Sequence, residues 1–455
     1  MENQRKYLPI LNLIKYILRV IVIMLLGFSY INESEIFSTI AILMMGLIIL
    51  IGNNTDDFYL YIFLLPFSDF VAFGDRNILF VFHLISIFKI IYSNMHKRVS
   101  LIALFSFILL IGVITINDFP NISIGRYIYI VSIIAYYSIF IILSNFSKIN
   151  RKYLAISIFT TISVVLFFIV LGSNGNIFEI TGVDETNRLG EETRQLGGAM
   201  GVPIYIMIFI TCTFVYLTSE KTNKLVRMML ILISLIFGYI GFLTLSRVYL
   251  LGLAVFLVML ILSQLKSLKR TNQKIKIILY LLVFALAIVI SITNLEGLIN
   301  MTINRGQEDI STGRFDIYSS IFDFLMNNPL NLLIGKGVIY YSIYGKENGY
   351  LFSMTAHNLY LDSIMSWGLL GTVAFLTITF YAYSRLSKDM KKKVSIISMT
   401  PMIVWLAMVL VGDAFYYFKT YIIILSLIMV SGLYGKVNND VQEVSYNEKY
   451  TNSIV

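Results

Sequence analysis

Residues 154–171 read LAISIFTTISVVLFFIVL, eighteen positions without one charged side chain. About 20 mostly apolar residues cross a hydrocarbon core roughly 30 Å thick as a helix, so a run of this length predicts a membrane span. Comparable runs at 40–51 and 277–292 contribute to a mean hydropathy of +0.80. Of 455 residues, 58% are apolar and 13% are charged, whereas soluble chains are about 25% charged. The sequence predicts an all-α, polytopic integral membrane helix bundle.

The connections between these runs carry most of the positive charge. Five basic residues lie in 265–276 and five in 385–393, with smaller clusters at 96–98, 148–152 and 221–224. Short loops rich in Lys and Arg stay cytoplasmic. The net charge of +9 is therefore a topology signal, and a nucleic-acid partner is not expected. Alternation from a cytoplasmic N-terminus puts every cluster inside, so both termini are predicted to be cytoplasmic.

Between 12 and 14 membrane helices are expected, because Pro66 and Asp69 interrupt the third span. The basic start at Arg5 and Lys6 precedes no small-residue cleavage site, which favours a retained first helix over a cleaved signal peptide. We expect a transmembrane bundle over 1–435 and a disordered cytoplasmic tail over 436–455. The expected spans are 16–31, 36–52, 58–73, 78–93, 99–116, 125–144, 153–172, 201–218, 225–244, 248–264, 277–293, 361–384, 394–412 and 418–434.

The longest polar segment, 294–360, is a large extracytoplasmic loop in this topology. Inside it, residues 314–328 carry apolar side chains at helical spacing, which predicts a partly folded loop with a helix on the outer surface of the bundle. Ser311 or Thr312 is a suitable cap at its start, and Pro329 ends the helix because the residue before a proline avoids helical angles. The expected apolar stripe consists of Phe315, Tyr318, Ile321, Phe322 and Leu325.

Several classes of chemistry have no sequence support. The chain lacks a Gly-x-x-x-x-Gly-Lys-Ser/Thr phosphate loop and an Asp-x-Asp pair for a metal-bound nucleotide. Its three histidines, His83, His96 and His357, are too scattered for a zinc site built on His and Cys. We therefore expect no cofactor and no metal. His83 and His96 are interpreted as structural, and the single Cys212 says nothing about redox compartment.

Three polar residues of the outer face are candidates for function. Arg247 begins an outer helix end, where it either marks a site or extends to lipid headgroups. Arg314 begins the loop helix, where the helix N-terminus favours an anion, although a surface salt bridge is the alternative. His357 is suited to a general base, or is a simple polar contact at the interface. Arg194 lies in the acidic outer loop 173–200, together with Arg188.

Seven short motifs then resemble the O-antigen ligase and polymerase family. The resemblance covers mainly residues 190–375, and its strength is in the order and spacing of the pieces. The first half of the chain matches only as a string of membrane helices. The motifs are Arg194-Gln195-Leu196-Gly197-Gly198, Leu245-Ser246-Arg247, Ser311-Thr312-Gly313-Arg314-Phe315, Asn328-Pro329-Leu330, Gly335-Lys336-Gly337, His357-Asn358-Leu359-Tyr360-Leu361 and Gly368-Leu369-Leu370-Gly371.

The resemblance implies a glycosyltransferase on the outer membrane face that uses polyprenyl-diphosphate-linked sugars. By this resemblance, Arg247 and Arg314 match arginines that hold the donor diphosphate, His357 matches the catalytic base, and Arg194 matches an arginine of the preceding outer loop. One position departs from the family: where a tryptophan often follows the loop arginine, this chain has Ile317 and Tyr318.

The expected function is the polymerisation of lipid-linked repeat units in bacterial surface polysaccharide biosynthesis, such as O-antigen or capsule, at the cytoplasmic membrane. Expected partners are the polyprenyl-diphosphate-linked oligosaccharide and membrane lipid, with a chain-length regulator and a flippase as possible protein partners. Two alternatives stay open. One is a ligase that moves the glycan to a separate acceptor, and the other is a flippase or transporter of lipid-linked oligosaccharide.

Overall fold

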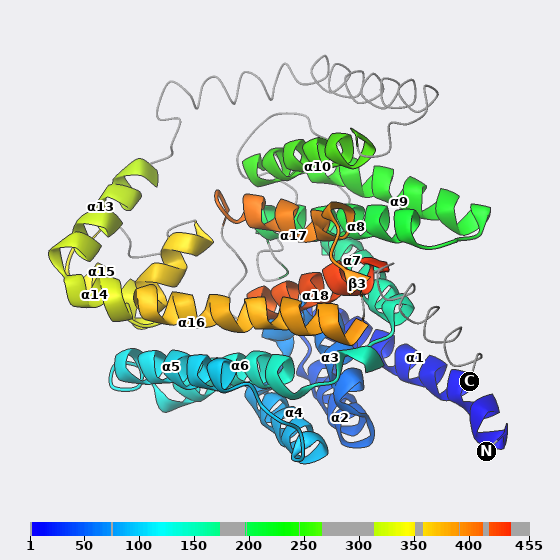
Figure 1. The fold of residues 1–455 in the computed structure, drawn as a ribbon, viewed down its shortest axis with the longest axis horizontal. Helices are drawn as coiled ribbons and strands as arrows, with labels where there is room; N and C mark the ends of the chain where they lie inside the picture. The colour runs from blue at the N-terminus through cyan, green and yellow to red at the C-terminus, as the bar shows by residue number, and fades with distance from the viewer. Residues whose placement is uncertain are drawn as a thin grey trace, which may run out of the picture.

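The computed structural model describes residues 2–73, 76–172, 196, 198–244, 246–265, 314–350, 358–390, 392–412 and 418–437. Within this part the chain is a bundle of roughly aligned helices with a smaller group of helices at one end (Figure 1). The bundle helices are α1 (Glu2–Asn32), α2 (Glu35–Ile51), α3 (Asn54–Leu64), α4 (Leu79–Asn94), α5 (Leu101–Asp118), α6 (Ile124–Leu143), α7 (Arg151–Gly172), α8 (Gly198–Ser219), α9 (Lys224–Leu243), α10 (Arg247–Leu265), α16 (Leu359–Met390), α17 (Ile396–Met408) and α18 (Phe418–Leu433).

Seven of the described helices are long and apolar enough to cross a membrane, and five shorter apolar helices accompany them. Large apolar side chains such as Phe88, Leu225 and Phe380 lie exposed on the bundle's surface, as lipid-facing residues would. The all-α, polytopic prediction is confirmed. The expected spans correspond to described helices except 277–293, which lies outside the described residues.

The third expected span, 58–73, is wrong at its far boundary. α3 begins with a capping box between Asn53 and Asp56 and ends at Leu64, because Pro66 cannot continue the helix. A 3-10 turn, Ser68–Phe70, and a short antiparallel pair, β1 (Ala72–Phe73) with β2 (Arg76–Asn77), follow it. Eleven residues reach only about 16 Å at 1.5 Å per residue, so α3 alone does not cross the bilayer.

Those connections rich in basic residues that the structure describes meet at one end of the bundle, which we call the basic end. Here Lys97 donates to the Leu143 carbonyl at 3.0 Å, and Arg385 donates to the Ile141 carbonyl at 2.9 Å. Arg151 pairs with Glu220 at 2.7 Å. The alternation expected from loop charge therefore agrees with the packing, because loops expected on one side contact each other.

Further elements close the basic end. β3 (Lys392–Lys393) pairs antiparallel with β4 (Lys436–Val437), and the Tyr434 hydroxyl donates to the Arg151 carbonyl at 2.9 Å. The expected tail over 436–455 begins with β4, and its residues after 437 lie outside the described residues.

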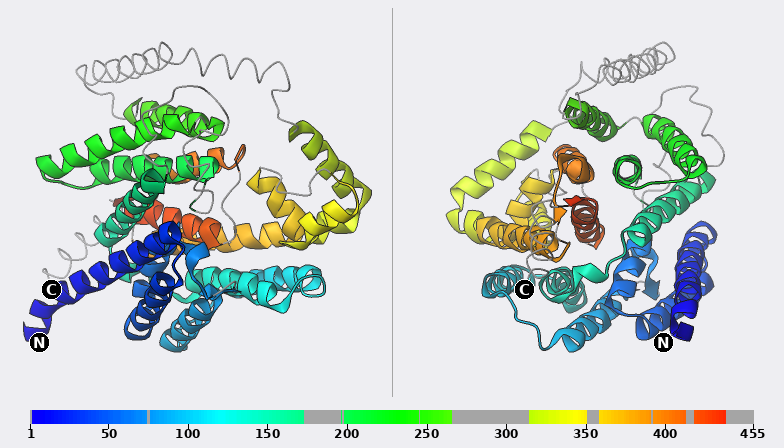
Figure 2. Two further views of the ribbon diagram at one scale, coloured as in Figure 1. Left: turned by 180° about the vertical axis from the view of Figure 1, so that it is seen from behind. Right: turned by 45° about the vertical axis from the view of Figure 1, so that its right-hand side comes forward.

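α18 runs through the core of the bundle, and all sixteen of its residues are buried. It packs against α3, α6, α7, α16 and α17, and the views in Figure 2 show it between them. At the end opposite the basic end, which we call the far end, Lys419 of α18 pairs with Asp69 at 2.7 Å. The core helix therefore holds together elements that are distant in the sequence.

His83 is part of this core. It is fully buried, its Nδ1 lies 3.2 Å from the Ser132 hydroxyl, and its ring stacks on Tyr136 and Phe418. This packing agrees with a structural role for His83.

Candidate functional site

Three short helices form a cap on the far end: α13 (Arg314–Asn327), α14 (Pro329–Ile334) and α15 (Tyr340–Glu347). The predicted loop helix is confirmed, and it ends at Asn327, one residue before the predicted boundary. Pro329 stands in the first turn of α14, a position that proline favours because its missing N–H has no partner there anyway. Figures 1 and 2 show these helices projecting beyond the bundle.

The buried face of α13 differs from the predicted stripe. Ile321, Phe324 and Leu325 are buried, whereas Phe322 is 63% exposed. The cap has its own small core, in which these residues pack with Tyr341 and Met365. Because the neighbours of α13 come from α14, α15 and α16, helical spacing alone placed the stripe partly on the wrong face.

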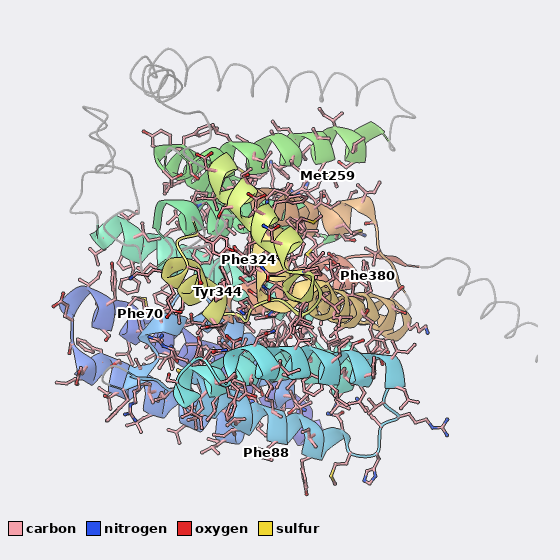
Figure 3. All side chains as sticks on the ribbon, turned by 90° about the vertical axis from the view of Figure 1, so that its left-hand side faces the viewer. Phe70, Phe88, Met259, Phe324, Tyr344 and Phe380 are labelled. Carbon is pink, nitrogen blue, oxygen red and sulfur yellow. The ribbon has the colours of Figure 1, made fainter. Side chains whose placement is uncertain are left out.

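The aromatic residues of the cap are mainly used in packing. Tyr344 and Tyr350 stack with ring centroids 6.3 Å apart, and Phe324 contacts both. The Lys336 ammonium lies 4.5 Å from the Tyr344 ring centroid, a favourable cation–π distance. Figure 3, which faces the far end, labels Phe324 and Tyr344 on the cap.

The glycines of two sequence motifs meet where the cap joins the bundle. α16 is broken at Gly368, whose φ is +61° and ψ −172°. A Cβ on Gly335, whose φ is +75°, would lie 2.5 Å from the Ser366 carbonyl oxygen, and Gly335 and Gly368 leave no room for side chains between them. Glycine is needed at both positions, because other residues rarely adopt such angles and a Cβ would clash with backbone.

The break divides α16 into a first half, 359–367, and a longer second half, 369–390. Asn358 caps the first half, since its side-chain oxygen accepts the backbone N–H of Tyr360 at 3.0 Å and of Leu361 at 3.2 Å. An N-cap asparagine contributes about 1 kcal/mol to helix stability. Sequence reasoning did not assign this role, although Asn before an apolar helical segment is a usual cap signal.

The start of α16 is fixed against the end of α17. The Leu359 N–H donates to the Val409 carbonyl at 3.0 Å, and the Tyr360 hydroxyl donates to the Leu406 carbonyl at 3.1 Å. His357, two residues before Leu359, lies outside the described residues. The chain therefore enters α16 directly beside the final turn of α17.

The start of α10 reaches the same turn. A Cβ on Gly412 would lie 2.7 Å from Val248 Cγ2, and one on Gly252 would lie 2.6 Å from Met408 Sδ. The hairpin before α10 is tight because Tyr249 lies over Gly241 and donates to the Gly238 carbonyl at 2.8 Å. Arg247 is the first residue of α10, so its backbone lies at the far end beside the residues that hold the start of α16.

The four predicted site residues are thus described to different extents. Arg247 and Arg314 are placed as the first residues of α10 and α13, both at helix N-termini. Arg194 and His357 lie outside the described residues, as do Ser311, Thr312 and Arg188. In the described ranges, no group of three or more His, Cys, Asp or Glu side chains gathers that could hold a metal ion.

The apolar helices of the bundle define the class of this protein as a multi-pass membrane protein. Residues 230–376 match the family model described as O-antigen ligase. The match confirms the resemblance indicated by the motifs and supports the O-antigen ligase and polymerase family for this chain. No curated protein and no solved structure gives a match.

The matched segment includes Arg247, Arg314 and His357, together with both halves of the Gly335–Gly368 contact, whereas Arg194 precedes it. The match supports a function of the O-antigen ligase or polymerase type in general, with a lipid-linked oligosaccharide as the class of substrate.

Proposed function

We propose that this chain is a metal-independent glycosyltransferase that polymerises polyprenyl-diphosphate-linked repeat units at the outer face of a bacterial cytoplasmic membrane. In this proposal the far end is extracytoplasmic and both termini are cytoplasmic. The observation that carries the proposal is the meeting of α10 and α16 on one turn of α17. Val248 packs against Gly412, and Leu359 bonds to Val409. Val248 and Asn358 are 110 positions apart in the sequence, and each is next to a predicted site residue. Both therefore lie at the same end of α17.

The arginines bind the donor in this mechanism. Arg247 and Arg314 each begin a helix, where free backbone N–H groups and the helix dipole already favour anions. A guanidinium adds forked, charge-assisted hydrogen bonds to phosphate oxygens. Together they hold the donor diphosphate, with Arg194 as a further contact, while the polyprenyl tail lies in the bilayer.

His357 acts as the general base. It removes the proton from an acceptor sugar hydroxyl, whose oxygen attacks the anomeric carbon of the donor from the face opposite the diphosphate. A new glycosidic C–O bond forms, and the bond between the anomeric carbon and the phosphate oxygen breaks. The electron pair leaves on polyprenyl diphosphate, whose developing charge the arginines stabilise. Configuration inverts, and no nucleotide is consumed because the leaving group is already activated.

A ligase reaction uses the same chemistry with a separate acceptor, and remains the second candidate. The family match favours neither reaction over the other. Polymerisation is preferred because the acidic loop 173–200, with Arg188 and Arg194, offers an additional anion contact for a second lipid-linked substrate.

The test is the size distribution of surface glycan from cells that express His357→Ala, beside wild type and a deletion, at matched membrane protein levels. Single repeat units in place of long chains are expected from a polymerase that uses His357. Long chains that stay on the lipid carrier indicate a ligase instead. If His357→Ala makes normal polymer at a normal protein level, His357 is not the catalytic base, and the alternative of a transporter is favoured.

A further inference from the structure

Asp118 closes the last turn of α5 and is fully buried. Its carboxylate accepts three backbone N–H groups of the cap, although these lie more than 200 residues later in the chain. Oδ2 accepts from Val338 at 2.7 Å, and Oδ1 accepts from Ile339 at 3.2 Å and from Tyr340 at 3.3 Å. These donors precede and open α15, whose N-terminus favours a negative charge. Among the described residues, no basic side chain pairs with Asp118.

The segment 334–340 approaches α5 closely because residue 337 is glycine. Gly337 has a φ of +98°, and a Cβ there would lie 2.6 Å from Asp118 Oδ1. The neighbouring Asn117 donates its side-chain amide to the Ile334 carbonyl at 2.8 Å. The final turn of α5 therefore holds both ends of this segment.

The same segment also holds the first half of α16. The Lys336 N–H donates to the Met365 carbonyl at 2.7 Å, and the Gly337 N–H donates to the Ser366 carbonyl at 3.0 Å. Because α16 is broken at Gly368, carbonyls at the end of its first half lose helical partners, and the cap supplies replacements. A third link joins the Tyr341 hydroxyl to Asp362 Oδ1 at 3.0 Å.

We propose that Asp118 is a positioning residue for the transfer reaction. This inference rests on the proposed function. Asp118 fixes segment 334–340, the segment fixes the first half of α16, and that half-helix continues from His357 and Asn358. The half-helix is also fixed at its start by α17, so loss of the Asp118 link frees one of its two anchors. The half-helix that follows the base then samples more positions, while Arg247 on α10 keeps its separate support at the end of α17.

Loss of the Asp118 link is expected to affect kcat more than the KM for the donor. A misplacement of about 1 Å in a reacting group lowers rate by as much as about 100-fold. Arg247 keeps its support, whereas α13, which begins with Arg314, packs on the half-helix itself. We therefore expect the KM for the donor to change less than kcat. Asp118→Asn keeps the size of the side chain but places an NH₂ group against N–H donors. We therefore expect kcat to fall about 10- to 100-fold, with a smaller change in KM.

The experiment compares full-length wild type, Asp118→Asn and Asp323→Asn in lipid nanodiscs. Asp323 is an exposed residue of α13, so its substitution also removes one carboxylate but does not affect the contact with segment 334–340. The donor probe is polyprenyl-diphosphate-linked repeat units extracted from cells that lack this chain. Transfer gives kcat and KM, and hydrogen exchange of the amides of Val338, Ile339 and Tyr340 reports the link itself.

Support consists of faster exchange at these amides in Asp118→Asn together with a fall in kcat that is larger than the change in KM, while Asp323→Asn matches wild type. Faster exchange in Asp118→Asn with an unchanged kcat overturns the positioning role. Exchange equal to wild type at these amides, in an Asp118→Asn protein that still transfers sugar, overturns it as well. If Asp118→Asn does not accumulate, Gly337→Ala reaches the same contact from the cap and must give the same fall in kcat, larger than the change in KM. A wild type that transfers no sugar overturns the proposed function, and the positioning role falls with it.

Discussion

Single glycines decide how closely the cap approaches the bundle. Gly335 and Gly368 come from different motifs, and each has a positive φ and backbone neighbours where a side chain would be. The close contact between Gly335 and Gly368 gives a physical reason why glycine occurs in two of the motifs on which the family resemblance rests. These glycines shape the site and need not contact a substrate.

We predict that Gly368→Ala destabilises the protein strongly. The residue would have to adopt a φ of +61°, a strain of about 1–3 kcal/mol, and its Cβ would clash with the backbone of Gly335 and its neighbours. A lower thermal unfolding midpoint in detergent measures the effect. Gly112→Ala in α5, where a Cβ meets no atom within 4 Å, is the matched control and should be neutral or slightly stabilising, since alanine favours a helix by up to about 1 kcal/mol. Equal midpoints for the two variants would contradict this account of Gly368.

We predict that Arg247→Lys reduces transfer almost as much as Arg247→Ala. A lysine keeps the charge but loses the forked hydrogen bonds that match a diphosphate. The readout is the rate of glycan transfer at equal protein level. Arg126→Ala provides the control, because Arg126 is an exposed arginine at the same end of the molecule. Full activity of Arg247→Lys would reduce the role of Arg247 to a simple positive charge.

At the scale of elements, helix positions followed from composition more reliably than helix ends and faces. The third expected span failed at Pro66, and the stripe on α13 failed at Phe322, which is exposed. The third span ended early for a local reason, because proline cannot continue a helix. On α13, packing partners from other parts of the chain decided which face is buried. The cap helix itself was predictable, because Asn328-Pro329 gives a local stop signal.

The cap has its own core, so its stability can be tested separately from the bundle. Phe324→Ala removes a fully buried ring from the cluster with Tyr341 and Met365, a change of about 3–5 kcal/mol for a core phenylalanine. We expect faster proteolysis of segment 314–350 while the bundle stays folded. Phe322→Ala, two residues away and 63% exposed, should cleave like wild type. Equal cleavage of both variants would mean that the cap is not held by this core.

At the scale of the molecule, the two ends of the bundle separate basic connections from the cap and the candidate site. We predict that an impermeant thiol reagent applied to intact cells labels Ser123→Cys, in the turn after α5, and does not label Ser147→Cys, in the connection after α6. Both serines are exposed. The single native cysteine, Cys212, is buried and is replaced by serine in the background. Labelling in the reverse order would invert the proposed topology and place the cap in the cytoplasm.

The sequence by itself determined the class of the protein, the spacing of most membrane helices and the alternation of their ends. These properties depend on the transfer of apolar residues into lipid and on the charge of short loops, which are local quantities. It also predicted the cap helix α13 and the residues that the family resemblance singles out, although two of these, Arg194 and His357, lie outside the described residues.

Only the tertiary structure decided which of these local features meet. Nothing near Asp118 in the sequence indicates that it binds the N–H groups of Val338–Tyr340, and nothing near Gly412 indicates that it packs on Val248. A buried carboxylate needs hydrogen-bond donors. Which donors it contacts is decided only when helices that are distant in the sequence pack side by side. The site is therefore a product of packing between helix ends, which single-sequence periodicity does not encode.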